Sequence, residues 1–520
     1  MPHCLPFRAR RGIQAARHGL LAVLALLVGC TSARPATAPQ GTASPPPLER
    51  EFRGVWIASV SNIDWPSQPG LPAAQQQAEL LRMLDRAVEL RLNAIVLQIR
   101  PAADALYASS HEPWSEYLTG EMGQAPDPYY DPLEFAVTEA HRRGLELHAW
   151  FNPYRARHPS AQSTISDEHL SRSRSDIVHA YGRHLWMDPG EPDVQEHSLR
   201  VILDVVRRYD IDGVHVDDYF YPYPETDTAG QPIPFPDETS WERYRRTGGQ
   251  LERDDWRRDN VDRFIERLYR EIKREKPWVK FGISPFGIWR PGYPPQIRTG
   301  FDQYGQIYAD ARKWLVEGWM DYYTPQLYWP IAQTPQSYPV LLRWWVEQNA
   351  RGRHIWHGNF TNRVMYGNTP FWPASEVLAQ IYVTRGQPGA TGNVHFSMRT
   401  LMANPDSLVE RLATEAYVEP ALAPASPWLW GGAPGAPRVR MIAGAAGEVR
   451  LSLQPRGRTQ PTWWVVRVRG EEGWTTQILP GWQREHTLPA REGAVRQVVV
   501  SGVDRVGNEG PETAVHSRRD

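Results

Sequence analysis

Eight short apolar segments of strand length recur between residues 53 and 398, and they constrain the fold more than any other feature. Most of them follow a stretch whose apolar residues recur at helical spacing, such as Gln75–Leu92 and Leu133–Arg143. This alternation predicts an α/β protein built on a (β/α)8 barrel, also called a TIM barrel. An open doubly wound sheet is the alternative, but no glycine-rich fingerprint opens a helix after the first strand. The expected strands are Arg53–Val60, Asn93–Ile99, Leu145–Phe151, Gly213–Asp217, Val279–Ser284, Met320–Leu327, His354–Asn359 and Asn393–Ser397.

The sequence changes character after residue 420. Residues 421–437 are rich in Pro, Gly and Ala and are typical of a linker, and the helical period disappears beyond them. Strand-like runs then recur at short intervals, which predicts an all-β sandwich over residues 438–520. The ending SGVDRVGNEGPE resembles the last strand of a fibronectin type III-like module. We therefore expect a barrel domain over residues 51–420, a linker over 421–437 and a C-terminal β-module.

The N-terminal region is typical of a processed export signal. Basic residues precede the apolar run Leu20–Val28, which is too short to span a bilayer comfortably. Leu27–Cys30 (LVGC) resembles a bacterial lipobox, so residues 1–29 are predicted to be a lipoprotein signal peptide and Cys30 the lipidated residue. An ordinary secretory signal with a chance cysteine is the alternative. Residues 30–50 form a Pro-rich tether, so a folded domain held at a membrane surface is expected.

Charge and composition exclude some function classes. Lys+Arg is 58 and Asp+Glu is 59, so the net charge of −1 lacks the basic excess typical of nucleic-acid binding, and no nucleic acid is expected as a partner. The only cysteines are Cys4 and Cys30, which leaves the globular region without a disulfide or a cysteine metal site. The 22 Trp and 22 Tyr suit either a large core or stacking platforms for sugars.

Polar residues recur at the ends of the expected strands, where barrel enzymes carry their active sites. Alternate residues of a barrel strand face inward. Where the apolar residues of a strand face the helices, the polar residues between them face the barrel interior, and several of these lie at the mouth. These are Gln98, Arg100, Asn152, His215, Asp217, Ser284, Gln326, Tyr328 and Asn359. A polar network that only closes the barrel is the alternative. His148 and His215 are more typical of hydrogen-bonded structural residues than of metal ligands, and we expect neither a metal nor a cofactor.

Glycoside hydrolysis requires two carboxyl groups, one to protonate the leaving oxygen and one to attack the sugar or activate water. Asp217 is the candidate nucleophile or base. Asp218 is adjacent, so it is expected to point to the opposite side of the strand. Its expected role is to orient the substrate or to replace Asp217 as the nucleophile or base. Glu112 is the candidate proton donor, because the neighbouring Trp114 is expected to desolvate its carboxyl group and raise its pKa. A solvated loop carboxylate is the alternative for Glu112.

Aromatic residues are concentrated in the loops that follow the strands, which suits stacking along an extended glycan. They are Trp65, Tyr107, Trp114, Tyr154, Tyr219, Tyr221, Trp289, Tyr328 and Trp329, whereas Trp56 is expected in the core. With the polar residues they define a predicted substrate-binding set. That set is Arg100, Gln98, Asp104, Trp114, Asn152, Tyr154, Arg155, His215, Tyr219, Ser284, Gln326, Tyr328, Trp329 and Asn359.

Several stretches match a known family in order along residues 51–400. They are FRGVWIASVSNIDWP, LNAIVLQIRPAADALYASSHEPWSEYLTG, HAWFNPYR, IDGVHVDDYFYPYP, FGISPFGIWR and DYYTPQLYW, and they resemble the bacterial glycosyl hydrolase-like family 10 lipoproteins. The resemblance implies a TIM barrel, glycosidase activity and an envelope location. Members include an outer-membrane lipoprotein that cleaves peptidoglycan glycan strands lacking stem peptides. The matched motifs carry Glu112, Asp217 and Asp218 as site residues.

The hypothesis is a lipid-anchored glycoside hydrolase of the outer membrane, facing the periplasm, that cleaves peptidoglycan glycan strands. Its partners would be the polysaccharide, the membrane through Cys30, and division or envelope proteins. A glycosidase for another envelope or extracellular polysaccharide is one alternative, and a non-catalytic glycan-binding lipoprotein is another. Retaining, inverting and lytic cleavage all remain open.

Overall fold

A computed structural model describes residues 44–365, 371–444, 448–488 and 495–517. The predicted signal peptide, Cys30 and the first part of the tether lie outside these described residues. Within them, none of the helices is both long and apolar enough to cross a membrane.

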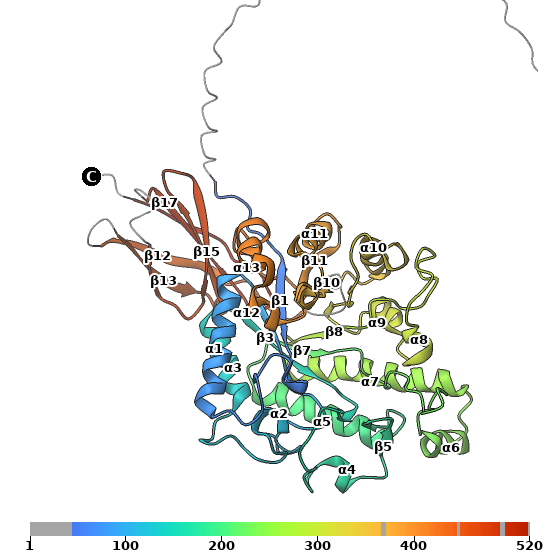
Figure 1. Cartoon of the computed structure of the whole chain (residues 1–520). Helices are drawn as coiled ribbons and strands as arrows, with labels where there is room; N and C mark the ends of the chain where they lie inside the picture. Colours follow the sequence, from blue (N-terminus) through green and yellow to red (C-terminus); the bar gives the residue numbers. More distant parts are fainter. Residues whose placement is uncertain (1–43, 366–370, 445–447, 489–494, 518–520) are drawn as a thin grey trace, which may run out of the picture. The chain divides into compact units, whose positions relative to one another are not determined.

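The predicted barrel is confirmed: eight parallel strands close in the order β1-β11-β10-β9-β8-β7-β3-β2. Figure 1 shows them at the centre of a ring of helices. The strands are β1 (Phe52–Ile57), β2 (Ala94–Arg100), β3 (Glu146–Phe151), β7 (Gly213–Val216), β8 (Lys280–Ile283), β9 (Tyr322–Tyr323), β10 (His354–Asn359) and β11 (Ala390–His395). The last residues of β2, β3 and β7 lead into the loops of the mouth.

Amphipathic helices cover the outside of the barrel. Helix α3 shows why they form where they do: Asp131 accepts hydrogen bonds from the backbone N–H groups of Leu133 and Glu134, and Pro132 occupies the first helical position. The main helices of the ring are α1 (Ala73–Glu89), α3 (Pro132–Arg142), α5 (Pro192–Arg208), α7 (Arg253–Glu275), α9 (Ala311–Glu317), α10 (Tyr338–Gln348), α11 (Ala374–Arg385) and α12 (Met398–Ala403).

The strand alternation separates two apolar layers. Ile95 and Leu97 of β2 belong to the large cluster between strands and helices, whereas Val96 belongs to the cluster inside the barrel. Inside, the rings of Phe52 and Trp356 stack with centroids 3.7 Å apart. The interior also holds Trp56, Trp150, Tyr322 and Val394. The barrel is therefore a packed core below its mouth.

One feature of the mouth has no counterpart in the expected pattern. The long loop after β3 forms a small antiparallel sheet in the order β4-β6-β5, from β4 (Arg155–Arg157), β5 (Val178–Tyr181) and β6 (His184–Met187). This sheet holds Arg155 and His158 beside the mouth.

The C-terminal sandwich is also confirmed. One sheet has the order β12-β13-β16 and the other β15-β14-β17-β18, and all pairs are antiparallel. The apolar faces of Trp464, Leu451 and Val500 meet in its core. Its strands are β12 (Gly435–Ala443), β13 (Val449–Arg456), β14 (Trp463–Arg469), β15 (Trp474–Pro480), β16 (Glu485–Leu488), β17 (Gln497–Val503) and β18 (Thr513–His516).

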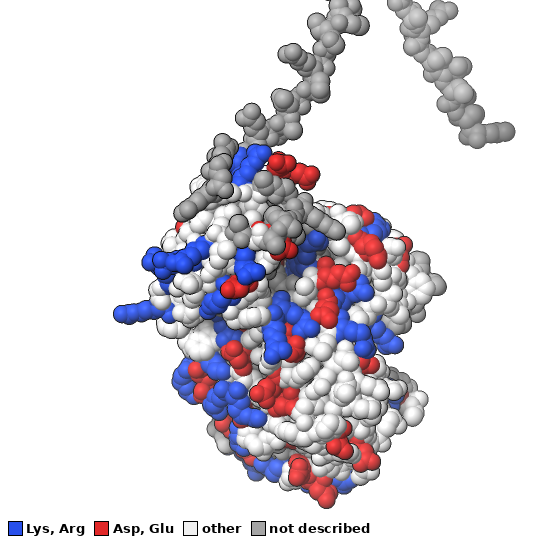
Figure 2. Space-filling view, turned by 90° about the vertical axis from the view of Figure 1, so that its left-hand side faces the viewer, with Lys and Arg blue, Asp and Glu red and all other residues white. Residues whose placement is uncertain are grey.

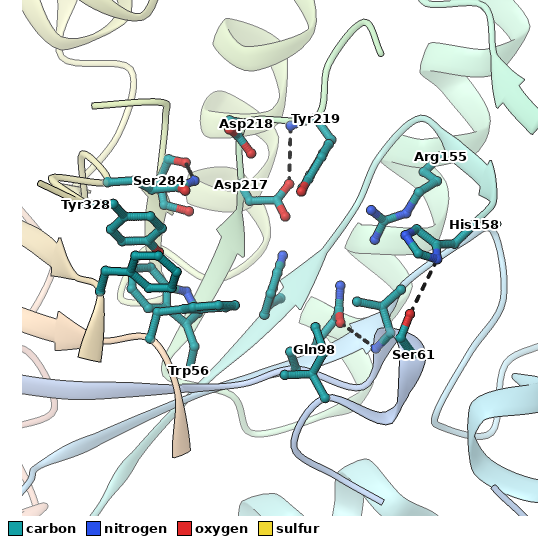
Figure 3. Close-up of a pocket in the computed structure, with 17 residues that line it drawn as sticks. Trp56, Ser61, Gln98, Arg155, His158, Asp217, Asp218, Tyr219, Ser284 and Tyr328 are labelled. Atoms are coloured by element: carbon teal, nitrogen blue, oxygen red, sulfur yellow. Dashed lines mark hydrogen bonds between the residues drawn. The ribbon is translucent and has the colours of Figure 1, made fainter. Parts of the chain in front are cut away.

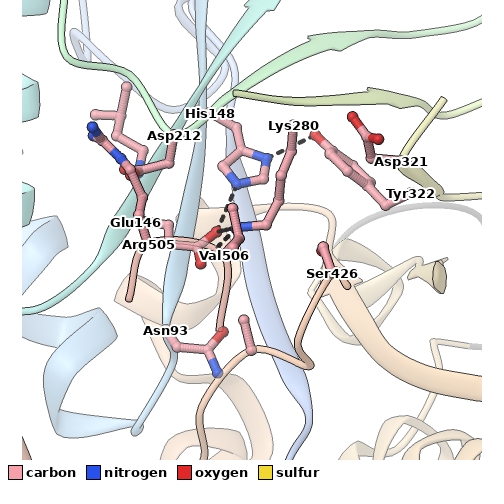
Figure 4. Close-up of polar contacts among 12 residues, drawn as sticks. Asn93, Glu146, His148, Asp212, Lys280, Asp321, Tyr322, Ser426, Arg505 and Val506 are labelled. Atoms are coloured by element: carbon pink, nitrogen blue, oxygen red, sulfur yellow. Dashed lines mark hydrogen bonds and ion pairs between the residues drawn. The ribbon is translucent and has the colours of Figure 1, made fainter. Parts of the chain in front are cut away.

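Barrel and sandwich are joined by specific contacts at the N-terminal ends of the barrel strands (Figure 4). Arg505 donates to Asp212 over 2.9 Å and to Asp210 over 2.5 Å, and the Trp463 indole donates to the Gly144 carbonyl over 3.0 Å. The expected linker packs here as well, because His354 bonds Ser426 over 3.0 Å. Residues 44–520 accordingly form one compact unit.

Candidate active site

A cavity of about 300 Å³ opens at the C-terminal mouth of the barrel. It contains eight of the predicted site residues: Gln98, Arg155, Asp217, Asp218, Tyr219, Ser284, Gln326 and Tyr328. It also contains Trp150, an inward position of β3 by the strand alternation, although Trp150 is not in the predicted substrate-binding set. The other lining residues were not predicted for the site, namely Trp56, Ala58, Val60, Ser61, Ile63, His158, Phe360 and Phe396. In Figure 3 Tyr328 and Trp56 lie on one side of the two aspartates, and Arg155 and His158 lie on the other.

Asp217 and Asp218 both line this cavity. The expectation that they point to opposite sides of a strand is wrong, because β7 ends at Val216 and the two residues belong to the following loop. Asp217 accepts a hydrogen bond from the Asn152 side-chain amide over 2.7 Å and another from the Tyr219 backbone N–H over 3.4 Å. Asp218 accepts a hydrogen bond from the Tyr223 hydroxyl. The loop therefore presents two neighbouring carboxyl groups to one space.

The electrostatics of this pair favour a shared proton at neutral pH. Burial raises the pKa of Asp217 to about 7, and the charge of Asp218 adds to the rise. Burial raises the pKa of Asp218 to about 6, although the hydrogen bond from Tyr223 opposes the rise. Two buried carboxylates side by side repel one another, so the pair titrates as a unit. Near pH 7 it holds a proton and a negative charge at once.

A network of polar side chains orients Asp217 through Asn152. The Asn152 side-chain oxygen accepts from Gln98 over 2.6 Å and from Arg155 over 2.8 Å, which orients the amide nitrogen toward Asp217. The Arg155 guanidinium also lies 4.9 Å from the ring centroid of Tyr219. Arg155 is thus a positive charge next to the aspartate pair. Its charge opposes the rise in pKa that burial causes in both aspartates.

His215 forms part of a hydrogen-bonded column along the barrel axis and is not a member of the aspartate pair. The indole of Trp56 can only donate, so His215 Nε2 accepts it over 3.2 Å and Nδ1 carries the hydrogen toward the Tyr322 hydroxyl over 3.1 Å. Burial lowers the pKa of His215 well below its usual value, so the ring is neutral. Its Nε2 also lies 2.9 Å from the Ser284 hydroxyl, at the cavity.

The column continues to the other end of the barrel (Figure 4). Tyr322 bonds His148 over 2.8 Å, His148 bonds Glu146 over 3.0 Å, and Lys280 donates to Glu146 over 2.9 Å. A Cβ atom at Gly213 would lie 2.6 Å from the His148 ring, so this strand position has no room for a side chain. Both histidines have partners inside the protein, as expected for structural histidines. In the described part of the chain, no group of three or more His, Cys, Asp or Glu residues could hold a metal ion.

The expected raised pKa of Glu112 is wrong. Arg100 donates to its two oxygens over 2.8 and 2.5 Å, and His197 bonds it over 2.8 Å. These partners outweigh burial and lower the pKa of Glu112 to about 2. Glu112 is absent from the cavity lining, and Trp114 contacts Tyr129 instead of covering a free carboxyl group. Glu112 is therefore an ionised partner of Arg100, and this geometry does not support a proton-donor role.

Other predicted substrate-binding residues lie outside the cavity lining. Asp104 is buried, accepts the Ala102 backbone N–H over 2.8 Å, and has its pKa raised by burial to about 6. Asn359 donates to Gln380 over 2.9 Å, and Trp329 packs edge-on against Phe286. Four of the predicted loop aromatics are buried in the core, namely Trp65, Tyr107, Tyr154 and Tyr221. Tyr219 and Tyr328 are the two of that set that line the cavity.

Trp56 is both a core residue and a wall of the cavity, although the sequence interpretation placed it in the core alone. The signal was present, because Phe52, Trp56 and Ala58 share one parity and face the barrel interior. Ser61 lies in the short 3-10 helix Val60–Asn62 with a non-helical backbone, and His158 lies in a loop, so no strand period indicates the direction of either side chain.

A closed (β/α)8 barrel with a carboxyl pair and aromatic walls at its C-terminal mouth has the architecture of a barrel enzyme. The family model described as "Glycosyl hydrolase-like 10" matches residues 51–371. The chain therefore belongs to the glycosyl hydrolase-like 10 family.

Curated relatives agree with this assignment. The chain is 42% identical to the glycosyl hydrolase YngK of Bacillus subtilis (strain 168) over 421 residues, which cover 80% of this chain and 81% of that protein. It is 36% identical to the glycosyl hydrolase DigH of Escherichia coli (strain K12) over 354 residues, which cover 63% of this chain and 78% of that protein. The solved glycoside hydrolase domain of PgaB (BpsB) from Bordetella bronchiseptica aligns with a TM-score of 0.47 and 13% identity, covering 71% of this chain and 99% of that domain.

Proposed function

We propose that this glycoside hydrolase cleaves the glycan strands of peptidoglycan, with strands that lack stem peptides as the preferred substrate. The observation that carries the proposal is the pairing of Asp217 and Asp218 in one buried cavity. A lipid anchor at Cys30, an outer-membrane location facing the periplasm, and contact with envelope or division proteins belong to the same proposal. The lipobox-like Leu27–Cys30 supports the anchor.

The proton for the leaving group comes from Asp217 in this mechanism. Burial and the charge of Asp218 raise the pKa of Asp217, and the proposal places the proton of the pair there because the Tyr223 hydroxyl donates its hydrogen bond to Asp218. Asp217 protonates the glycosidic oxygen as the bond to the anomeric carbon breaks, and Asp218 stays a carboxylate held by Tyr223. This reverses the role that the sequence interpretation assigned to Asp217.

The nucleophile need not come from the protein. Retaining and inverting enzymes place two carboxyl groups on opposite sides of the scissile bond. The described lining of this cavity has no acidic residue besides the adjacent pair Asp217 and Asp218. Every sugar of a peptidoglycan strand carries a 2-acetamido group, whose carbonyl oxygen can reach its own anomeric carbon. In the proposal this oxygen attacks, Asp218 accepts the hydrogen bond of the acetamido N–H, and water then opens the ring while Asp217 regains its proton.

The test compares glycans with and without stem peptides and with and without acetamido groups. The full chain, purified in detergent, is incubated with amidase-treated peptidoglycan strands, intact sacculi and a β-glucan without acetamido groups, and the products are identified by mass spectrometry. Cleavage of the peptide-free strands, slower cleavage of sacculi and no cleavage of the glucan are expected. Failure to cleave either form of peptidoglycan would overturn the proposed substrate. Equal cleavage of the glucan would overturn the role of the acetamido group.

A further inference from the structure

A second aromatic cavity lies where the sandwich meets the barrel, with a volume of about 590 Å³. Trp278 comes from the barrel, in the loop that leads into β8, and Trp430 comes from the segment before β12. Their ring centroids are 6.3 Å apart and the rings are tilted by 44°. Trp430 is 71% exposed, the most of any large apolar side chain in the described residues. An indole so exposed contributes little to the core and leaves most of its ring available for contact with a ligand.

The segment that carries Trp430 is held on both sides. Leu429 is buried, and the Gly432 backbone N–H donates to the Asp504 carboxylate over 2.9 Å. Between them, a Cβ atom at Gly431 would lie 2.4 Å from Val506, so the backbone passes directly over β-module residues. Arg505 lines the same cavity and is anchored by Asp210 and Asp212 of the barrel. The indole of Trp430 is therefore presented by a braced backbone, as a stacking platform requires.

The cavity combines aromatic faces with free hydrogen-bonding groups. Arg458 and Gln460 line it, are exposed, and have no side-chain hydrogen bond or ion pair with the described part of the chain. The indole Nε1 of Trp278 is buried and faces away from solvent, so Trp278 offers the cavity its ring and not its donor. A sugar ring has an apolar C–H face that stacks on an indole and hydroxyl edges that satisfy such donors and acceptors. An apolar protein partner would leave these polar groups without partners.

The two cavities lie at opposite ends of the barrel. Trp278 precedes the first residue of β8, at the N-terminal end of the strands, whereas the aspartate pair follows the last residue of β7, at the C-terminal end. We infer that the Trp278–Trp430 cavity is a second, non-catalytic binding site for a segment of glycan chain. The choice of peptidoglycan sugars as the ligand rests on the proposed function. A long strand engaged at this site stays near the enzyme between cleavage events.

The test uses the full chain with Asp217→Asn and Asp218→Asn, so that no strand is hydrolysed during binding. Affinity for peptide-free glycan strands is measured by biolayer interferometry, and hydroxyl-radical footprinting reads the solvent exposure of each tryptophan. Trp430→Ala is expected to weaken binding by about fivefold to tenfold. The matched control is Trp482→Ala, which removes another exposed indole, 62% exposed and outside this cavity, and leaves affinity unchanged. The strands are also expected to protect Trp430 from oxidation and to leave Trp482 reactive.

Several results would contradict the inference. Unchanged affinity in Trp430→Ala, equal losses in the two tryptophan variants, or protection of Trp430 by free stem peptides instead of glycan would each overturn it. These readouts do not depend on turnover. If the wild-type chain cleaved no peptidoglycan, the proposed function would be overturned. The affinity and footprinting results would still test the second binding site.

Discussion

The side-chain amide of Asn152 donates a hydrogen bond to Asp217 over 2.7 Å, and its oxygen accepts from Gln98 and Arg155. This relationship connects the loop of Asp217 and Asp218 to β2 and to the sheet beside the mouth. It also favours the ionised form of Asp217, because a donor to a carboxylate lowers its pKa.

Asn152→Ala should therefore change the pH dependence as well as the rate. Loss of the donor raises the pKa of Asp217 further, so the alkaline limb of kcat/KM moves to higher pH, and kcat falls by about tenfold to a hundredfold because the acid loses its orientation. The control is Asn359→Ala, a buried asparagine that bonds Gln380 outside the cavity. If the pH profile of kcat/KM in Asn152→Ala matched that of the wild type, Asn152 would not position Asp217.

The wild-type enzyme should have a bell-shaped pH profile. The proposed mechanism requires a proton on Asp217, whose pKa is about 7, and a negative charge on Asp218, whose pKa is about 6. The rate therefore falls below about pH 6 as Asp218 becomes protonated, and above about pH 7 as Asp217 loses its proton. The two limbs report the pair as a unit. Activity that keeps rising from pH 7 to pH 9 would show that no carboxylic acid in this range donates the proton.

Glu112→Gln is expected to destabilise the fold. The change leaves Arg100 buried without its counter-charge, and breaking such a pair costs about 3–5 kcal/mol in the free energy of unfolding. Urea unfolding measures the loss, and Arg100→Met combined with Glu112→Leu should recover part of it. The activity that Glu112→Gln retains should decline at alkaline pH as it does in the wild type. If a stable Glu112→Gln protein lacked this alkaline decline, Glu112 would be the proton donor.

The same ion pair predicts how stability depends on pH. The pKa of Glu112 is about 2 in the folded protein and near its ordinary value of 4.5 when unfolded. Its stabilising contribution is therefore complete above about pH 4.5 and decreases as the pH falls toward 2. Thermal unfolding between pH 3 and pH 6 should show a smaller slope in the Arg100→Met, Glu112→Leu double variant than in the wild type.

Arg505→Met should loosen the contact between sandwich and barrel. Arg505 and His141 hold the pKa of Asp212 well below its usual range, and removal of Arg505 leaves that buried carboxylate with less compensation. Limited proteolysis should then cut residues 421–437 faster, with a lower Tm. Arg496→Met is the control, because Arg496 is exposed and lies 4.0 Å from Glu471. Equal proteolysis of the two variants would show that Arg505 does not hold the junction.

The barrel could be predicted because each strand carries its own signal of buried, alternating residues. Inward positions such as Gln98 and Asn152 followed from the same alternation. The limit was reached at strand ends: β9 comprises only Tyr322–Tyr323, far less than the expected Met320–Leu327, and Asp217–Asp218 lie beyond the end of β7. Alternation does not apply past a strand end, so the two carboxyl groups were wrongly placed on opposite faces.

Glu112 shows why the site could not be predicted completely from the sequence. Its environment depends on Arg100 from β2 and on His197 from α5, which is 85 residues away in the chain. The neighbouring Trp114, visible in the sequence, lies against Tyr129 instead. Local sequence neighbours suggested desolvation, whereas distant charges determine the pKa. The sheet β4-β6-β5 was missed for a similar reason, because its strands are short and partly polar.

The most direct test of the central claim is hydrolysis of peptide-free peptidoglycan strands in H₂¹⁸O by the full chain and by the Asp217→Asn, Asp218→Asn double variant. Mass spectrometry of the new chain ends gives both the amount and the kind of product. The mechanism predicts ¹⁸O-labelled reducing ends from the wild type, and a loss of at least about a hundredfold in the double variant. Unlabelled anhydro ends, or wild-type turnover without both aspartates, would contradict it.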